Sequence, residues 1–268
     1  MYWQKNFKKV PSEKIVSIES RIKELRVQHK DWGYRRIYGQ MRKEGFNINH
    51  KRVQRIIQKY ALQVTSFTRK SRKYYSYKGK IGRLAPNLLK RKFDTNIPHQ
   101  KITTDTTEFK YRVVNSKGRI EIKKLYLDLF MDLYNREIIS YRISPKPTSE
   151  NILSALNDAI KVTNDCKYRR TFHSDQGWGY QMYAYTSMLK NNKIFQSMSR
   201  KGNCLDNAVI ENFFGILKQE IYYGQEYNSY QALETTIIKY IKYYNEERIK
   251  EKLNWMSPVE YRLANLIS

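Results

Sequence analysis

Hydrophobic and polar positions follow a helical repeat at the start of the chain. Apolar side chains recur three or four positions apart over residues 12–30, which predicts an amphipathic helix. A second apolar stripe covers residues 34–41, and a third, after the helix-capping residue type Asn49, covers residues 53–60. The pattern therefore predicts a small all-α domain over residues 1–65.

The period changes to alternation of apolar and polar positions after residue 100. The segments expected to be regular are strands over 102–114, 123–134, 137–144, 171–175 and 194–199, and helices over 149–162, 181–191, 207–221 and 229–244. Three strands in a meander followed by alternating helices and strands give a mixed sheet with helices on both faces. We expect the α/β fold of a ribonuclease H-like domain over residues 99–268, with five strands and the first strand beside the fourth.

Charge changes this picture because it is concentrated in the first part of the chain. The formal net charge is +26, and the first 100 residues hold 26 Lys and Arg against six Asp and Glu. Such a cationic surface is typical of proteins that bind nucleic acid. We expect a basic linker over residues 66–98, where ten Lys or Arg and three tyrosines fall between Arg69 and Lys92 without any acid. It could follow DNA phosphates, or it could be a solvated connection.

Two short helices joined by a tight turn, the second rich in Lys, Arg and Gln, predict a helix-turn-helix within residues 32–62. The alternative is a small helical bundle with a solvated charged face. The DNA contacts that we expect are Arg35, Arg36, Lys51, Arg52, Arg55, Lys59, Arg69, Lys70, Arg72 and Lys73 here, and Arg200, Lys201, Asn207 and Lys218 near the candidate site that follows.

Three acidic residues are candidates for a catalytic centre. Asp105 lies in the middle of the first predicted strand, Asp175 ends the fourth, and Glu211 lies on the helix after the fifth. The first two could converge because their strands are expected to be neighbours, and Asn207, Glu211 and Lys218 share one helical face. Carboxylates that converge need cations between them, and oxygen ligands without His or Cys favour Mg²⁺ or Mn²⁺. Two such ions could act in a phosphodiester displacement.

Other polar residues near these acids receive a structural interpretation. Asp128 and Asp132 lie on one face of the second strand, away from the position expected beside the fourth. Asp206 is expected to be the N-cap of the helix that carries Glu211. His173 lies on the same strand face as Asp175 and is expected to support the site as a buried histidine.

Several motifs resemble the second reading-frame product of a bacterial insertion-sequence transposase, in the retroviral-integrase superfamily with an Asp-Asp-Glu triad. They are HSDQG at 173–177, SRKGNCLDNAVIENFFGILKQE at 199–220 and YNEERIKEKLNWMSPVEY at 244–261. TTDTTEF resembles the motif of the first aspartate, and WGYRRIYGQMRKEGFNINHKRVQRI resembles the preceding helix-turn-helix. The 35 residues between Asp175 and Glu211 match the superfamily spacing, and Lys218 follows seven positions after the glutamate. The resemblance spans roughly residues 30–262.

The resemblance implies an enzyme that uses Mg²⁺ or Mn²⁺ to nick the ends of the element and to join the freed 3′-hydroxyl to DNA. Its catalytic and metal-binding residues would be Asp105, Asp175 and Glu211. The implied partners are double-stranded DNA, further copies of the chain on that DNA, and an upstream-frame protein or fusion, because no heptad run of the kind found in that upstream frame occurs here.

The chain departs from the family pattern at two positions, Ile102 in place of a common Trp and Gly179 in place of a larger polar residue. Neither change removes a carboxylate. The C-terminal motif of the family is matched by Tyr244, Asn245, Arg248 and Pro258, for which helix packing is one explanation.

Two other functions stay open from the residues alone, a metal-dependent DNA nuclease without strand joining and a catalytically idle DNA-binding regulator. An RNA-directed ribonuclease is more distant. The two cysteines, Cys166 and Cys204, form no disulfide framework or zinc pattern. No signal peptide or membrane span is expected, so we expect a bacterial cytoplasmic protein, associated with the nucleoid when it binds DNA.

Overall fold

The computed structural model describes residues 13–65, 84–201 and 203–266 and divides the chain into two compact units. One unit comprises Met1–Thr68 and Ile249–Trp255, and the other comprises Arg69–Arg248 and Met256–Ser268. No helix in the described ranges combines the length and the apolar character needed to cross a bilayer.

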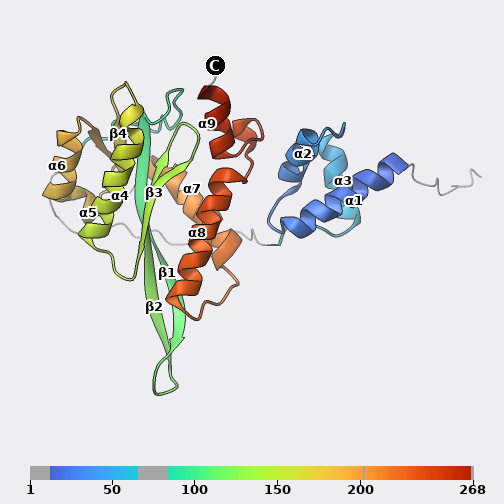
Figure 1. Ribbon diagram of the computed structural model, residues 1–268, viewed down its shortest axis with the longest axis horizontal. Coiled ribbons are helices and arrows are strands. Elements are labelled where there is room, and N and C mark those ends of the chain that lie inside the picture. The colour runs from blue at the N-terminus through green and yellow to red at the C-terminus, as the bar shows by residue number, and fades with distance from the viewer. Residues whose placement is uncertain (1–12, 66–83, 202, 267–268) are drawn as a thin grey trace, which may run out of the picture. The chain divides into compact units, whose positions relative to one another are not determined.

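The helical unit contains α1 (Glu13–Gln28), α2 (Tyr34–Lys43) and α3 (His50–Lys59), drawn in blue in Figure 1. Their apolar stripes meet in a core that includes Ile22, Ile37 and Val53, all fully buried. The Asn49 side chain caps α3 by accepting a hydrogen bond from the backbone N–H of Lys51 at 2.7 Å, as its residue type predicts. These three helices confirm the predicted all-α region.

A short segment from the far end of the sequence completes this helical unit. Residues 249–255, which include the 3₁₀ turn η4 (Glu251–Leu253), belong to it, and Ile249 is buried in the same core. The Trp255 ring meets the Tyr38 ring edge to face with centroids 5.9 Å apart. It also lies against Gly39, where a Cβ would be 2.2 Å from the indole, so only glycine fits there. The sequence did not predict this arrangement.

The second unit is built on a five-stranded sheet in the order β3-β2-β1-β4-β5. The strands are β1 (Lys101–Val114), β2 (Ile120–Asp132), β3 (Ile138–Ser144), β4 (Thr171–Ser174) and β5 (Phe195–Met198). The pairs β1–β2 and β2–β3 are antiparallel, whereas β1–β4 and β4–β5 are parallel. This mixed sheet, with the first strand beside the fourth, confirms the predicted ribonuclease H-like fold.

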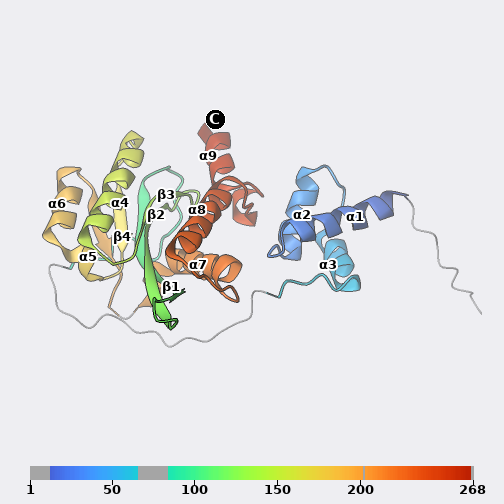
Figure 2. The ribbon, with the colours of Figure 1, turned by 60° about the horizontal axis from the view of Figure 1, so that its bottom comes forward.

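Helices cover both faces of the sheet, as Figures 1 and 2 show. One face packs against α4 (Ser149–Val162), α5 (Trp178–Gln181) and α6 (Tyr183–Asn191) around Ile102, Phe130 and Phe172. The other packs against α7 (Ala208–Leu217) and α8 (Tyr230–Glu246) around Phe109, Leu127 and Phe213. The short turns are η1 (Thr163–Asp165), η2 (Cys204–Asn207) and η3 (Lys218–Tyr222), and α9 (Pro258–Leu266) ends the described chain. Alternate residues of β1 therefore face different cores.

The later part of the predicted basic linker packs on the sheet unit. Leu89 is buried, and the N–H of Leu88 donates to the Ser197 hydroxyl of β5 at 2.9 Å. The carbonyl of Pro86 accepts from the N–H of Met198 at 3.3 Å. A description of residues 66–98 as a linker therefore does not fit their last part. Arg69, Lys70, Arg72 and Lys73 lie outside the described residues.

Candidate active site

The register between β1 and β4 brings two of the predicted carboxylates together. Lys101 pairs with Thr171 and Thr103 with His173, so Asp105 lies two residues beyond the last pair on β1 and Asp175 directly follows β4. Neighbouring strands lie about 4.8 Å apart, and equal spacing along both chains would keep the two side chains on one face of the sheet. Both aspartates are half-buried. The charge of Asp175 raises the pKa of Asp105, so the two carboxylates lie within electrostatic range, and their convergence on one ion stays a prediction.

Helix α7 and the turn after it run along this same face of β1. The Thr103 hydroxyl donates to Oδ1 of Asn207 at 3.0 Å, just before α7, and Nζ of Lys218, just after it, donates to the Thr107 hydroxyl at 2.6 Å. Asp105 lies between these two threonines on the strand. Glu211 lies one helical turn after Asn207 and is exposed. Glu211, the third predicted acid, therefore lies on the part of the helix between these two contacts with β1.

Burial, with help from neighbouring charges, raises the pKa of the three acids. Burial raises the pKa of Asp105 well above its ordinary value, and the charges of Asp175 and Glu211 raise it further, against the N–H of Thr106 and the ammonium of Lys218. Burial also raises the pKa of Asp175, with the N–H of Gly177 opposing it. Burial and the charge of Asp175 raise the pKa of Glu211. A cation among these groups would stabilise their ionised forms.

Backbone N–H groups orient one oxygen of each aspartate. Oδ1 of Asp105 accepts from the N–H of Thr106, and Oδ1 of Asp175 accepts from the N–H of Gly177, both at 2.8 Å. A Cβ at Gly177 would be only 2.9 Å from Oδ1 of Asp175, so glycine permits this close approach. The second oxygen of each carboxylate accepts no hydrogen bond within the described residues. Hard carboxylate oxygens of this kind suit Mg²⁺ or Mn²⁺.

The three acids are not gathered tightly enough in this structure to enclose one ion by themselves. Across the described ranges, no three His, Cys, Asp or Glu side chains form such a group. The exposed position of Glu211 and the repulsion among the three charges are consistent with this.

The prediction that Asp206 caps α7 is wrong. Asn207 holds the cap position, and the Asp206 carboxylate instead accepts from Nε of Arg200 at 2.8 Å, Nε of Arg91 at 2.9 Å and Nδ2 of Asn87 at 2.9 Å. The two guanidinium groups bind a carboxylate more strongly than helix N–H groups do. They hold the pKa of Asp206 well below its ordinary value. Arg200 therefore joins the loop to the helix entry, in addition to any contact with DNA.

His173 supports this same region as a neutral side chain. It is fully buried, with Nε2 at 2.8 Å from the carbonyl oxygen of Asp206 and Nδ1 at 2.8 Å from the Ser197 hydroxyl. Because a carbonyl only accepts, Nε2 must donate and Nδ1 then accepts from the hydroxyl. Burial lowers the pKa of His173, which favours this neutral form. The histidine connects β4, β5 and the start of α7.

The predicted DNA contacts of the helical unit occupy different environments. Lys51 and Arg55 are exposed on α3 and Arg52 is half-buried beside them, on the side away from the buried Val53 and Ile57. Two of the others lie near an acid: the ammonium of Lys59 is 3.1 Å from Glu19, and the exposed Arg35 is 3.8 Å from Glu251. Arg36 lies over the Trp32 ring. Lys201 of the sheet unit is exposed. The structure thus presents a compact basic face on α3.

A buried polar pair lies behind the site, on the opposite face of β1. The Thr106 hydroxyl donates to Oδ1 of Asp128, and the Tyr180 hydroxyl is 3.3 Å from that of Thr106. Asp128 is only 2% exposed, and its Oδ2 has no partner among the described residues. Asp132 accepts from the N–H groups of His99 and Tyr134 at 2.9 and 3.0 Å. Both acids have structural partners, as predicted, but burial of the unsatisfied oxygen of Asp128 was not foreseen.

Replacing Asp128 with asparagine should change how stability depends on pH. Burial raises the pKa of Asp128 from its ordinary 3.8 to about 6. Its contribution to folding stability is therefore fully present below pH ~4 and is lost as the pH rises through about 6. Urea unfolding should show that the free energy of unfolding of Asp128→Asn, relative to that of the parent chain, rises by about 2 kcal/mol between pH ~4 and pH ~7. A difference that is constant with pH would contradict this.

The C-terminal motif holds α8 against the sheet. The Tyr244 ring meets the Phe213 ring with centroids 4.7 Å apart, and the Asn245 amide bonds both the N–H and the carbonyl of Ile138 at 2.9 Å. Arg248 forms a buried ion pair with Glu220, and the carbonyl of Pro258 accepts from Asn135 at 2.9 Å. Packing therefore accounts for all four motif residues.

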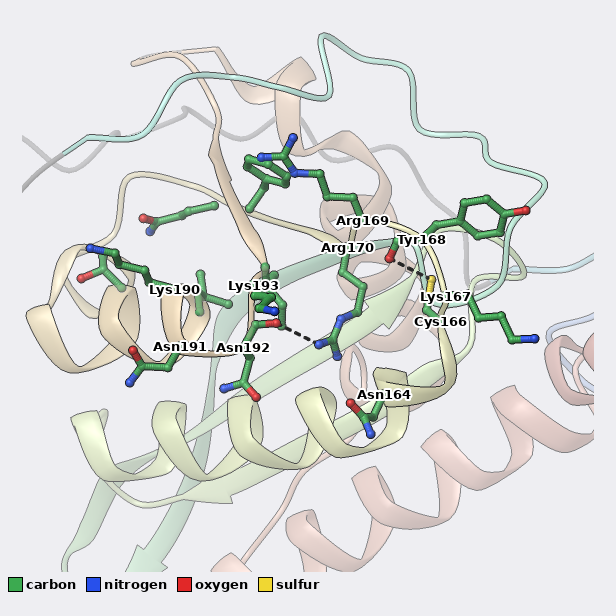
Figure 3. A pocket seen from close by; sticks show the side chains of 15 residues that line it. Asn164, Cys166, Lys167, Tyr168, Arg169, Arg170, Lys190, Asn191, Asn192 and Lys193 are labelled. Atoms are coloured by element: carbon green, nitrogen blue, oxygen red, sulfur yellow. Dashed lines mark hydrogen bonds between the residues drawn. The ribbon is translucent and has the colours of Figure 1, made fainter.

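A cavity of about 900 Å³ opens near the start of β4 and β5, at the end away from Asp175 (Figure 3). Arg170 crosses its wall and donates to the carbonyl oxygens of Ile160 and Asn192. The basic residues that line it are Lys167, Arg169, Arg170, Lys190 and Lys193. None of the three site acids lines it, so it is separate from the candidate site.

Family models match most of the chain. Two models described as "Integrase core domain" match residues 95–204 and 211–266, and one described as "HTH-like domain" matches residues 16–71. The last match confirms the predicted helix-turn-helix character of the helical unit.

Similar sequences occur among curated proteins. A "Putative transposase InsK for insertion sequence element IS150" of Escherichia coli is 42% identical over 251 residues, which cover 93% of this chain and 84% of that protein. An "Uncharacterized transposase-like protein" of Haemophilus influenzae is 46% identical, covering 84% of this chain and 97% of that one. Among solved structures, the HTLV-2 integrase catalytic core in complex with magnesium is 16% identical with a TM-score of 0.44, covering 62% of this chain and 97% of that one.

Proposed function

Because this chain belongs to the insertion-sequence transposases with an integrase core domain, which transfer DNA strands, we propose that Asp105, Asp175 and Glu211 form its reaction centre. In the proposed reaction the centre cleaves DNA at the ends of the element and joins the freed 3′-hydroxyl to another DNA site.

The observation that supports this centre best is the register of β1 against β4. Continued by two residues, this register would bring Asp105 beside Asp175. The contacts of Asn207 and Lys218 with β1 support a position for Glu211 on the same side of the strand. Catalytic groups held on strands and a helix keep a defined geometry.

The oxygen donors of the site suit Mg²⁺ or Mn²⁺, and we assign it two ions, around which the three carboxylates would draw closer than they are in this structure. Each aspartate has one oxygen oriented by a backbone N–H and a second oxygen available to a ligand. Burial raises the pKa of all three acids, and the charge of Asp175 raises those of Asp105 and Glu211 further, which divalent cations would offset. When bound, such ions activate an attacking oxygen and stabilise a leaving one.

Two neighbouring side chains are available to position the DNA strand. Asn207 is 3% exposed, Thr103 orients its Oδ1, and its Nδ2 has no acceptor among the described residues. That amide could therefore donate to a phosphate oxygen. Lys218, anchored by Thr107 beside the three acids, supplies a positive charge for the same strand.

Double-stranded DNA is the partner of both units in this proposal. The basic face of α3, with Lys51, Arg52 and Arg55, would contact phosphates, as the residues of a helix-turn-helix do. The chain would act as a homo-oligomer on DNA, because two element ends must be held together. It would also work with an upstream-frame protein, or as a fusion with one.

The reaction products test this function directly. The chain is incubated with Mn²⁺ and a labelled duplex that carries the ends of its element, alone and fused to the upstream frame, and a parallel sample contains EDTA. We expect nicked ends and joined strands that EDTA abolishes. Nicks without joined products from both proteins would indicate a nuclease instead. No product from either protein would indicate an idle DNA-binding regulator.

A further inference from the structure

The β1–β2 hairpin extends well past the rest of its sheet. In the described sheet, β3 pairs with β2 from Tyr126 to Met131 and β4 pairs with β1 from Lys101 to Thr103, whereas β1 and β2 stay paired as far as Val114 and Ile120. Figure 1 shows the resulting two-stranded ribbon reaching beyond the helices of its unit, and in Figure 2 its tip comes forward. We call residues 112–123 the ribbon arm.

The ribbon arm is held at both ends. At its base, the N–H of Arg112 donates to the carbonyl of Tyr227 at 2.8 Å, and the Arg112 guanidinium is 2.6 Å from Glu226. At its tip, Oδ1 of Asn115 accepts from the N–H groups of Lys117 and Arg119, both at 2.9 Å. The arm is therefore a preformed projection of defined shape.

Three large aliphatic side chains of the arm are exposed together. Val114 is 71% exposed, and Ile120 and Ile122 are each 67% exposed. Val114 pairs with Ile120 and Arg112 with Ile122, so all three aliphatic side chains lie on one face of the ribbon. Exposed aliphatic residues that gather on one surface are typical of an interaction site.

The charge around this face favours DNA over protein as the occupant. Residues 110–124 contain six Lys or Arg and one acid, Glu121. Lysine is depleted in protein–protein interfaces, and charged side chains on edge strands hinder pairing with another strand. Cations of this density suit phosphates.

The shape of the arm also fits duplex DNA. The major groove of B-DNA admits a two-stranded β-ribbon, and aliphatic side chains in that groove contact thymine methyl groups. Cations on both strands of such a ribbon would face the phosphates on each side of the groove.

We propose that the ribbon arm enters the major groove of the duplex DNA that the transposase holds. Val114, Ile120 and Ile122 lie against base edges, while Lys117, Arg119 and Lys123 contact the flanking phosphates. This inference rests on the proposed function, because it assumes that duplex DNA is bound at the catalytic unit.

Site-specific crosslinking tests the arm. The full chain carries the photoreactive residue p-benzoylphenylalanine in place of Ile120 or, as a control, in place of Tyr183, which is 86% exposed on α6. Each protein is irradiated with a labelled duplex that carries the element end. We expect a DNA adduct from position 120 in clear excess over position 183. Adducts between two protein chains, or equal yields at both positions, would overturn the proposal.

Binding measurements add an independent readout. Fluorescence anisotropy of the same duplex over a salt series should show that Lys117→Gln with Lys123→Gln flattens the slope of log K against log salt by about 1–2. Lys239→Gln with Lys242→Gln, two exposed cations of α8, should leave the slope unchanged. Equal slopes for both double variants would also contradict the proposal that the ribbon arm binds DNA.

The assay for joined products separates the two proposals. Crosslinking from position 120 without joined products would support the arm and contradict the proposed strand transfer. Joined products without crosslinking would support strand transfer and contradict the arm.

Discussion

Replacing Asp175 with asparagine is expected to reduce strand cleavage and joining by about 10³-fold or more. The amide has the same shape and can still accept the N–H of Gly177 at the position of Oδ1, so the turn after β4 should keep its geometry. It loses the negative charge that would hold a divalent ion, whose contribution to the transition state is worth several kcal/mol. Each 1.36 kcal/mol corresponds to a tenfold change in rate. Initial rates of end cleavage with Mn²⁺ measure the effect.

A matched control is Glu108→Gln, which also removes a carboxylate from the sheet. Glu108 lies on β1 but on the face opposite Asp105, where it is 2.9 Å from Lys124. Its rate should stay within about threefold of the parent chain, because this surface ion pair contributes little to stability and lies on the other side of the strand from the three acids. The Asp175→Asn protein should also melt no lower than the parent without metal, because it removes one of three repelling charges. Cleavage within tenfold of the parent would exclude Asp175 from the centre.

Replacing Arg248 with methionine is expected to lower the free energy of unfolding of the sheet unit by about 3–5 kcal/mol. Arg248 and Glu220 have side chains only 4% exposed, and the guanidinium is 2.6 Å from Oε1 of the glutamate. The hydroxyl of Tyr240 donates to the other carboxylate oxygen at 2.9 Å. Methionine fills similar volume but leaves Glu220 as a buried charge without its ion-pair partner. Urea unfolding at neutral pH measures the loss.

Two further variants identify the cause of that loss. Adding Glu220→Gln to Arg248→Met should recover part of the stability, because the double variant leaves no buried charge at this position. Arg262→Met breaks a more exposed pair with Glu137 at 2.8 Å and should lower stability by only about 1 kcal/mol. Equal losses from Arg248→Met and Arg262→Met would show that burial does not set the strength of the first pair.

The sequence predicted the strands, most helices and the pairing of β1 with β4, because periodicity and element order determine these features. It failed where partners are far apart along the chain. Asp206 was a reasonable N-cap by residue type, but Arg91 and Asn87 reach it from more than 100 positions away. The unsatisfied Oδ2 of Asp128 depends on packing by both neighbouring elements, and alternation along one strand does not reveal it.

The late sequence segment in the helical unit has a consequence for protein synthesis. The ribosome makes α1, α2 and α3 first, but Ile249 and Trp255 enter the core of that unit only after nearly the whole chain has been translated. Until then, the surface beside Gly39 lacks the indole that covers it. The unit that emerges first is therefore the one whose core is completed last, and a nascent chain that stops before residue 249 leaves it incomplete.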